Sequence, residues 1–398
     1  MNDRLKQQKG NVLVFFAVAL TLFFTFLALS VDIGWIMLTK SELQAAADSA
    51  ALAGAAQLAE DDLDLARDFS QDFSSYNSAA KESIALERND SNAREGGIVV
   101  GYLHNPMDLS DPLQTEGLSR YNTVQVVTKR SAEINGPLRL FLGYFTGLEA
   151  VSIRTRAAAT LDDRVIGFDA TPGGSDSQTG RNLGFLPFAL YHQTWNAAYD
   201  ANYSPGPDDC PRESLSDDFA YENGKVRAGH DQIPELKMYP NRTLDCGLPG
   251  APGNFGTVDV GYSNNSTNDL VRQILEGISP EELAAVDNLR LTDNGHGVLS
   301  KMLEGDTGVS TAIKSALEQI IGQPRIIPLF MNRTGSGGDN ACYEICGFVG
   351  IRIMHVQMTG PLEDRYVLIQ MCKIHESKAI IHPDAPHSNS IYNLSLTR

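Results

Sequence analysis

The chain has 398 residues, enough for two or three domains, and its apolar content of 42% is ordinary for a soluble protein. A formal net charge of −17 argues against a broad basic face for nucleic acid, so we expect no nucleic-acid partner. One apolar anchor followed by a large polar remainder is therefore expected, rather than a protein with many membrane spans.

The N-terminal segment predicts this anchor. Residues 10–31 contain no Asp, Glu, Lys, Arg or His. A helix of this length reaches about 33 Å, enough to cross the hydrocarbon core of a bilayer. Arg4, Lys6 and Lys9 precede it against a single Asp3, which predicts a cytoplasmic N-terminus. A cleaved signal peptide is disfavoured, because the apolar run is too long and no clear A-x-A site ends it.

The helical character continues through residues 32–60, because neither Pro nor a Gly pair interrupts it before Leu58. One face of this water-side half carries mostly small residues, and we expect it to meet another surface closely. Two partners remain open for that face, the chain's own globular head and the helices of partner subunits. The predicted partner helix face consists of Leu43, Ala47, Ala50, Gly54 and Leu58.

These residues also carry a family resemblance. Lys9-Gly10 precedes the apolar span, Val31 to Gly34 (VDIG) ends it, and Ser41 to Ala55 reads SELQAAADSAALAGA. The first 60 residues resemble the N-terminus of TadG-like proteins of the Flp (tight adherence, Tad) pilus-assembly system. The D-x-A-A-L-A-G element from Asp48 to Gly54 is the most specific part.

The resemblance implies a non-enzymatic role in assembling, anchoring or organising the tip of a Flp-type pilus in cell adhesion. It also implies, as partners, other pilus-assembly membrane proteins, pseudopilins and the lipid bilayer. Pilin precursors of the system resemble G-x-x-x-x-E with cleavage after the Gly, but Phe15 stands five residues after Gly10. We therefore expect an uncleaved, single-pass protein of the bacterial inner membrane, with most of the chain periplasmic or extracellular.

The fold class expected is α+β. Residues 61–165 are predicted to form a pilin-like α+β head behind the long helix, as the resemblance favours, although the pattern alone fits any small α+β domain on a stalk. The elements predicted here are a polar helix over 60–94 that breaks near 76–78, a short apolar helix from Pro137 to Gly143 or Gly147, and strands at 98–103, 123–129 and 151–161.

Residues 166–184 are rich in Gly, Ser, Asp and Thr and are predicted to be a linker. Residues 185–382 are predicted to form a second α+β domain that ends in an antiparallel meander, followed by a polar tail at 383–398. The elements predicted here are a strand at 257–260, a helix through Leu275, a helix that begins at the capping box Ser279–Glu282, an amphipathic helix at 308–321, and strands at 325–331, 343–358 and 365–371.

No enzyme signature indicates a catalytic site. The patterns G-x-S-x-G, H-E-x-x-H, G-x-G-x-x-G and the P-loop do not occur in the sequence. His375, His382 and His387 lie near one another in sequence, but their spacing fits no common zinc pattern. The acidic stretch Asp208 to Asp218 fits a solvated loop better than a calcium site. We therefore expect no enzyme activity, no metal and no cofactor.

All five cysteines lie beyond the apolar span, on the side where disulfides can form. Cys342 and Cys346 would be about 13 Å apart in an extended strand, too far for a disulfide unless a bulge or turn intervenes. Cys210 with Cys246 is the favoured disulfide, because it would close a loop-rich segment. The odd cysteine count leaves one thiol free or intermolecular.

Two other functions remain open. A membrane-anchored periplasmic binding or sensory protein would use the loop-rich face between Asp208 and Gly256. An anchored hydrolase is the weakest alternative, because no pair of nucleophile and base can be named in the sequence.

Overall fold

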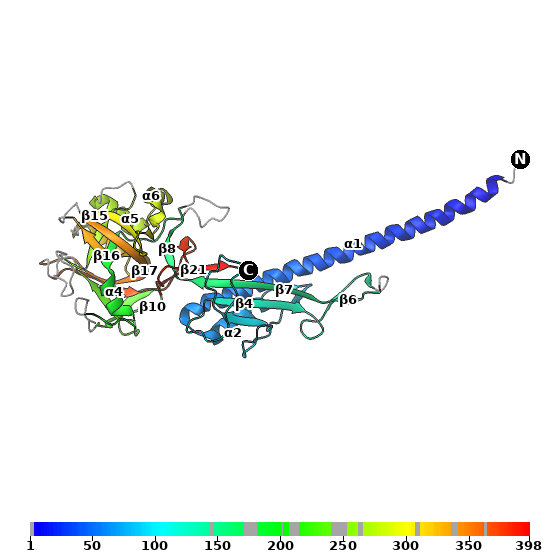
Figure 1. Cartoon of the computed structure of the whole chain (residues 1–398), viewed down its shortest axis with the longest axis horizontal. Coiled ribbons are helices and arrows are strands. Elements are labelled where there is room, and N and C mark those ends of the chain that lie inside the picture. The colour runs from blue at the N-terminus through cyan, green and yellow to red at the C-terminus, as the bar shows by residue number, and fades with distance from the viewer. Residues whose placement is uncertain are drawn as a thin grey trace. The chain divides into compact units, whose positions relative to one another are not determined.

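The chain divides into two compact units. The computed structural model describes residues 4–143, 147–170, 181–200, 202–206, 215–239, 253–261, 266–306, 311–335, 341–361 and 364–398. Unit 1 comprises Met1–Leu161 together with Leu394–Arg398, and unit 2 comprises Asp162–Asn393 (Figure 1). Unit 2 is therefore an insertion in the sequence of unit 1, and the last five residues of the chain return to unit 1.

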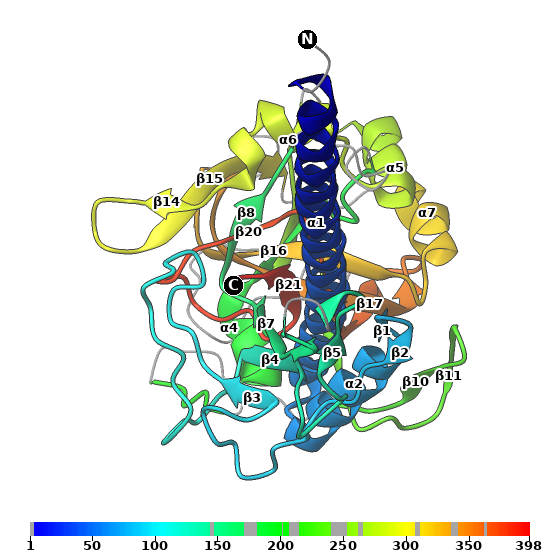
Figure 2. The ribbon, with the colours of Figure 1, turned by 90° about the vertical axis from the view of Figure 1, so that its right-hand side faces the viewer.

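Unit 1 begins with one long helix, α1 (Arg4–Gln57), which Figures 1 and 2 trace without a break. The expected continuation of the helix beyond the apolar span is present. A 3-10 turn, η1 (Leu58–Glu60), ends the helix, and Asp61 adopts a left-handed conformation there with φ 55°. The Asp62 carboxylate then caps α2 (Leu63–Ser75) by accepting the amides of Asp64 and Leu65 at 3.0 and 2.9 Å.

The sheet of unit 1 is antiparallel where β3 (Ile98–Gly101), β4 (Thr123–Arg130) and β7 (Ile153–Asp162) pair. These are the three strands predicted for this region. The end of β21 (Ile391–Leu396) extends the sheet on the other side of β7, where the Thr397 amide donates to the Ala158 carbonyl at 2.8 Å. Residues 383–398 therefore include a strand, where a polar tail was expected.

Of the two helices predicted in this unit, the first is confirmed only up to the break expected near 76–78, because α2 ends at Ser75, and the second is wrong. After Ser75 the chain forms the short hairpin of β1 (Ser78–Ala79) and β2 (Glu82–Ser83), followed by turns in which Asn89 and Asn92 adopt positive φ. The expected helix after Pro137 is instead a hairpin of β5 (Leu138–Arg139) and β6 (Ala150–Val151). Strand pairing and burial of Leu138 beside α1 override the local helical pattern there.

The water-side half of α1 is buried within unit 1. Its small side chains allow α2 and β4 to approach the helix backbone closely. The closest approach is at Gly54, where a Cβ would lie 2.1 Å from the Ser70 hydroxyl oxygen and 2.8 Å from the Ala66 carbonyl oxygen. All five residues of the expected partner helix face are buried here: Leu43, Ala47, Ala50, Gly54 and Leu58.

Unit 2 is built on an eight-stranded sheet in the order β12-β18-β17-β16-β9-β13-β15-β14. The long strand β17 also pairs with β15, so β17, β16, β9, β13 and β15 close into a ring. The strands of this sheet are β9 (Phe188–Tyr191), β12 (Glu235–Met238), β13 (Phe255–Val258), β14 (Thr292–Asp293), β15 (Leu299–Asp306), β16 (Pro324–Thr334), β17 (Ala341–Gln357) and β18 (Tyr366–Met371).

Short helices and two-stranded pieces complete unit 2. The helices are α4 (His192–Tyr199), α5 (Thr267–Glu276), α6 (Pro280–Ala285), η2 (Asp287–Leu289), η3 (Thr311–Ile313) and α7 (Lys314–Gln319). The remaining strands are β8 (Val165–Phe168), β10 (Phe219–Glu222), β11 (Lys225–Ala228), β19 (Ile374–His375) and β20 (Ala379–Ile381). β8 lies in the expected linker 166–184, of which residues 171–180 fall outside the described ranges.

Several predicted elements of unit 2 are confirmed. The capping box at the start of α6 is present, with both Ser279 and Glu282 bonded as expected. The strands β16, β17 and β18 form the expected antiparallel meander. The predicted helix at 308–321 is shorter, comprising η3 and α7, and it ends before Gly322 with φ 81°.

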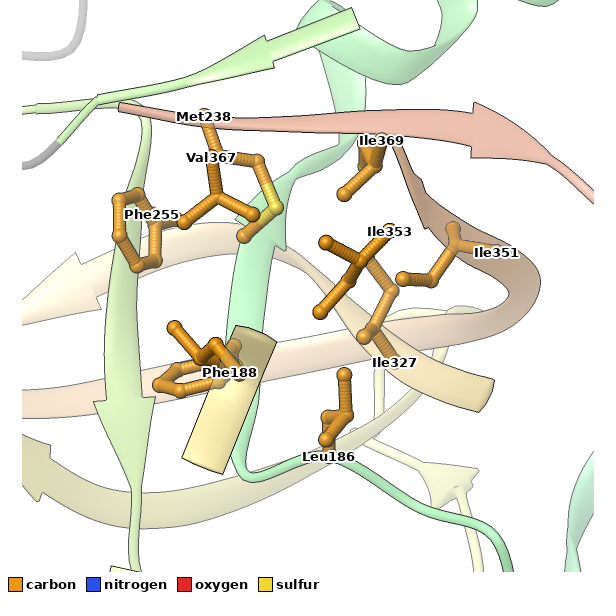
Figure 3. A pocket seen from close by; sticks show the side chains of 10 residues that line it. Leu186, Phe188, Met238, Phe255, Ile327, Ile351, Ile353, Val367 and Ile369 are labelled. Atoms are coloured by element: carbon orange, nitrogen blue, oxygen red, sulfur yellow. The ribbon is translucent and has the colours of Figure 1, made fainter. Parts of the chain in front are cut away.

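One core cluster of unit 2 contains apolar residues of the sheet together with residues of α5 and α7. Figure 3 shows the centre of this cluster, where side chains from β9, β12, β13, β16, β17 and β18 converge on a void of about 10 Å³. The lining is entirely apolar, so the void offers a water molecule no hydrogen-bond partner. This interior is a packed core and offers no room for a ligand.

A buried ion pair lies at the start of unit 2. The Arg164 guanidinium donates to the Asp162 carboxylate at 2.9 and 2.6 Å and to the Pro383 carbonyl at 2.9 Å. Both side chains are almost fully buried. The pair therefore ties the first residues of the unit to the chain segment that leads into its last strand.

Replacing Gly54 by Leu should destabilise unit 1 by about 1–3 kcal/mol, because the new side chain collides with the backbone and side chain of α2. Gly34→Leu is the matched control in the same helix, since a Cβ at position 34 meets no atom within 4 Å. Thermal unfolding of the full chain in detergent measures both variants. Equal melting of Gly54→Leu and Gly34→Leu would show that α1 is not seated on α2 as described.

Replacing Arg164 by Met should lower the free energy of unfolding of unit 2 by about 3–5 kcal/mol, because the Asp162 carboxylate is left buried without its partner. Lys314→Met removes a partly exposed pair with Glu318 in the same unit and should cost about 0–1 kcal/mol. Urea unfolding of the full chain, followed by the fluorescence of Trp195 in unit 2, compares the two. A similar cost for both variants would contradict the buried-pair assignment.

Candidate membrane anchor and partner surface

The N-terminal half of α1 is an apolar helix with its side chains exposed. Between Val12 and Leu38 most large apolar side chains are exposed, with Phe15 81% exposed and Met37 66% exposed, whereas Trp35 and Ile36 pack partly against unit 1. Consecutive residues are exposed, so the apolar surface runs around the whole helix. A long helix that is apolar on every side is typical of a membrane span. In the described part of the chain this is the one helix long and apolar enough to cross a bilayer.

The few polar side chains in this half are satisfied within the helix itself. The hydroxyls of Thr21, Thr25 and Ser30 donate to the carbonyl oxygens four residues earlier, at 2.9, 2.8 and 2.8 Å. Such bonds hide the hydroxyl groups from hydrocarbon without breaking the helix. The segment is therefore suited to lipid despite these three residues.

Asp32 marks the end of the fully apolar run and fixes the hairpin of β5 and β6 to the helix. Its carboxylate is buried and accepts the Phe141 amide at 2.8 Å and the Leu142 amide at 3.3 and 3.4 Å. The ring of Trp35 lies 5.4 Å from that of Phe141, centroid to centroid. The sequence analysis missed this junction, although an acidic residue directly after an apolar span was a signal for a local partner.

Below this junction the helix is held to unit 1 by polar contacts as well as by its small-residue face. The Glu42 carboxylate accepts the Ala80 amide at 2.8 Å. The Gln44 amide donates to Asp48 and to the Arg156 carbonyl, at 2.8 and 3.0 Å. The Thr128 hydroxyl donates to the Leu43 carbonyl at 3.1 Å. The expected partner helix face is thus covered by the chain's own unit 1, and the exposed large apolar side chains of α1 lie between Val12 and Leu38.

The candidate ligands named in the sequence do not assemble into a site in the described ranges. His387 bonds Asp163 at 2.6 Å, His382 lies 4.0 Å from Asp384, and His375 faces the ring of Tyr392. No group of three His, Cys, Asp or Glu side chains suited to a metal ion occurs among the described residues.

The acidic stretch is described only in its last part, because Asp208, Asp209 and Cys210 lie outside the described residues. The Asp217 carboxylate accepts the amides of Asp231 and Gln232 at 3.1 and 3.0 Å. These bonds stabilise a turn within unit 2, because the carboxylate accepts backbone amides as it would at the start of a helix.

The described cysteines are free thiols: Cys342, Cys346 and Cys372. Cys342 and Cys346 both lie in β17, in the extended arrangement that the sequence analysis considered too long for a disulfide. Burial raises the pKa of the Cys346 thiol to about 12, so it is protonated near neutral pH and is a poor nucleophile. The favoured pair Cys210 and Cys246 lies outside the described residues.

The described part of unit 2 holds two larger cavities, one of about 540 Å³ beside Arg181 and His375 and one of about 390 Å³. The lining of the second cavity mixes aromatic and polar side chains, among them His192, Trp195, Asn196, Cys346 and His387. The sequence analysis missed it, because these residues come from parts of the chain far apart and share no local motif. Its size falls within the range of small-molecule pockets.

Comparison with known proteins supports the N-terminal identification. Residues 10–57 match the family model described as Putative Flp pilus-assembly TadE/G-like. The bifunctional protein GlmU of Methanococcus maripaludis (strain C7 / ATCC BAA-1331) is 27% identical over 118 residues. That match covers 30% of this chain and 28% of the relative, so the chain spans well under a third of that protein. No solved structure matches the chain.

The family match coincides with α1 almost from end to end, since it begins at Gly10 and finishes at the last residue of the helix. It therefore includes both the exposed apolar half and the half seated in unit 1. The matched family is one of pilus assembly. The N-terminal segment of this chain is thus similar to the TadE/G-like region of the Flp pilus-assembly family, as its sequence resemblance indicated.

Proposed function

We propose that the protein is a single-pass, membrane-anchored, pilin-like component that assembles or anchors a Flp/Tad-type pilus. One observation carries the proposal: the residues that match the pilus-assembly family form a single helix, apolar and exposed in its first half and seated in a folded unit in its second. Such a helix passes directly from lipid into protein. It therefore holds the rest of the chain close to the membrane surface.

The orientation proposed places the N-terminus in the cytoplasm and both units outside the inner membrane, in the periplasm or beyond. The support is the basic tail, in which Arg4, Lys6 and Lys9 outnumber Asp3 directly before the apolar run.

The pilin-like character of unit 1 is supported by the arrangement of its main elements. The second half of α1 lies against β4, the central strand among β3, β4 and β7. A long helix laid across a small antiparallel sheet is the architecture expected of a pilin-like head. Residues Asp32 to Glu60 thereby belong structurally to the head, and residues 10–31 are left to face lipid and other helices.

The proposed mechanism is helix packing with partner subunits inside the bilayer. Because the face from Leu43 to Leu58 is covered by unit 1, partner helices would contact the exposed segment between Val12 and Val31. Association in lipid depends on close packing, which small residues permit. Ala17, Thr21 and Thr25 follow one another at four-residue intervals and so form a small-residue line on that segment.

A second function, an anchored binding or sensory protein, is favoured by the cavity of about 390 Å³ in unit 2. The proposed absence of enzyme activity applies to both functions. It is supported by the family match and by Cys346 at the cavity, since burial raises the pKa of this thiol and makes it a poor nucleophile. Loss of pilus formation on deleting the gene supports the first function, whereas normal pili with a lost response to a small molecule supports the second.

Replacing residues 12–27 by leucines should separate anchoring from packing. The variant keeps a span of the same length, so it should remain in the membrane fraction and melt like the wild type, because the buried Ala28 and the contacts of Asp32 with the hairpin are unchanged. It should lose co-purifying pilus-assembly proteins and pili, because the small-residue line is gone. Co-purification from membranes and electron microscopy of cells measure this, and normal pili with retained partners would overturn the packing mechanism.

The mature protein should keep Met1 or Asn2 at its N-terminus and resist extraction from the inner membrane by alkaline carbonate. The reason is Phe15, which occupies the place of the Glu that follows the cleavage site in pilin precursors. Intact mass spectrometry of the purified protein tests this, with cells that lack the prepilin peptidase as control. A mature N-terminus at Asn11 in wild-type cells alone would instead make the protein a processed pseudopilin.

A further inference from the structure

The hairpin of β5 and β6 continues beyond its paired residues toward the apolar half of α1. The Leu140 amide donates to the Glu149 carbonyl, and the Leu148 amide donates to the Gly143 carbonyl, both at 3.0 Å. The hairpin therefore keeps its two sides together past β5 and β6. Its far end is tied to Asp32, the first acidic residue after the apolar span.

This end of the hairpin exposes large apolar side chains. Phe141 is 66% exposed and Leu148 is 51% exposed, although both neighbours in the hairpin base, Leu138 and Val151, pack against α1. In water, exposed apolar side chains do not contribute to the stability of a folded unit. Beside a lipid-facing helix, the same side chains are placed where they can contact lipid.

The depth of this point along α1 follows from the helix geometry. Exposed apolar side chains continue from Val12 to Leu38, a length of about 40 Å, whereas the hydrocarbon core is about 30 Å thick. Lys40 is the first exposed basic residue after the span. Asp32 lies about 12 Å before Lys40 along the helix. The hairpin end therefore lies at the level where the apolar surface of α1 leaves the hydrocarbon and crosses the headgroup region.

We propose that the end of the β5–β6 hairpin is a second membrane contact, in which Phe141 and Leu148 enter the interface of the phospholipid bilayer beside Trp35. The occupant is lipid because Phe141 packs on Trp35 of α1, in the stretch of the helix that also exposes the apolar side chains of Ile33, Met37 and Leu38. Aromatic rings such as Trp35 and Phe141 are suited to that level of a bilayer. The inference rests on the proposed anchoring of α1 in a membrane.

Asp32 has a positioning role in this contact. A carboxylate so close to lipid is costly unless it is paired, and here it is buried and accepts two backbone amides. The same bonds hide the amides of Phe141 and Leu142, which would otherwise face a medium poor in hydrogen-bond partners. The Asp32 carboxylate is thus stabilised by hydrogen bonds, and the same bonds satisfy two backbone amides at the end of the hairpin. Unit 1 is then held to the bilayer at two points.

The test places a fluorescent reporter at the hairpin end of the full chain. Phe141→Trp is reconstituted into phosphatidylcholine vesicles with bromine on the acyl chains, which quenches tryptophan on contact. The emission added by the new residue, over that of Trp35 and Trp195, should be quenched several-fold more than in vesicles without bromine. Leu148→Trp is measured in parallel as an independent position on the same hairpin, in case the first substitution disturbs the ring contact with Trp35.

Met107→Trp is the matched control in unit 1. Met107 is exposed and apolar like Phe141, but its loop leads into the start of β4, which packs beside Gly54. That point lies 22 residues beyond Asp32 along α1, about 33 Å away, so its emission should not change. All variants are first checked for wild-type melting.

The outcomes separate this inference from the proposed anchoring. Vesicle flotation reports anchoring independently, and a chain that does not float with the vesicles contradicts the proposed anchor. A chain that floats, but whose residues 141 and 148 are quenched no more than residue 107, retains the anchor and overturns the hairpin contact. That second result would assign Phe141 and Leu148 to a protein partner.

Discussion

The structure depends on one helix that suits two different surroundings, hydrocarbon in its first half and a protein core in its second. Every backbone amide and carbonyl in the interior of α1 is bonded within the helix, so the segment can leave hydrocarbon and enter a protein core without exposing polar backbone. What changes along it is the side chains: large apolar groups in the first half, Ala and Gly in the second. The second half then allows α2 and β4 to approach to backbone distance at Gly54. A loop between the two halves would let the head move freely over the membrane, whereas a continuous helix fixes the head to the direction of the span.

Much of this could be predicted from the sequence, because the signals are local. The uncharged run of residues 10–31 predicts the apolar span, and the capping box of Ser279 and Glu282 predicts the start of α6. Alternation of apolar residues gives β4, β7 and the meander of β16 to β18. In each case neighbouring residues contain the reason for the structure.

The parts that could not be predicted depend on residues distant in the sequence. The segment after Pro137 has a helical composition, but Leu138 pairs with Val151 and the next amides bond to Asp32, more than a hundred residues away. The ring of strands in unit 2 closes only because β17 pairs with both β15 and β16. The small residues of α1 predict a close-packing surface. They do not predict its neighbours, Ala66 and Ser70 of α2, which are known only from the structure.

The return of the last residues to unit 1 changes how the chain carries mechanical load. Unit 2 is joined to unit 1 through the peptide chain after β7, and its other end runs into β21, whose final residues bond Ala158 in β7 itself. A force applied to unit 2 is therefore divided between a covalent connection and a row of strand hydrogen bonds. For the same reason, a single proteolytic cut inside unit 2 leaves one fragment covalently attached and the other held by the sheet. A domain attached in this way resists shear better than one at the end of a simple linker.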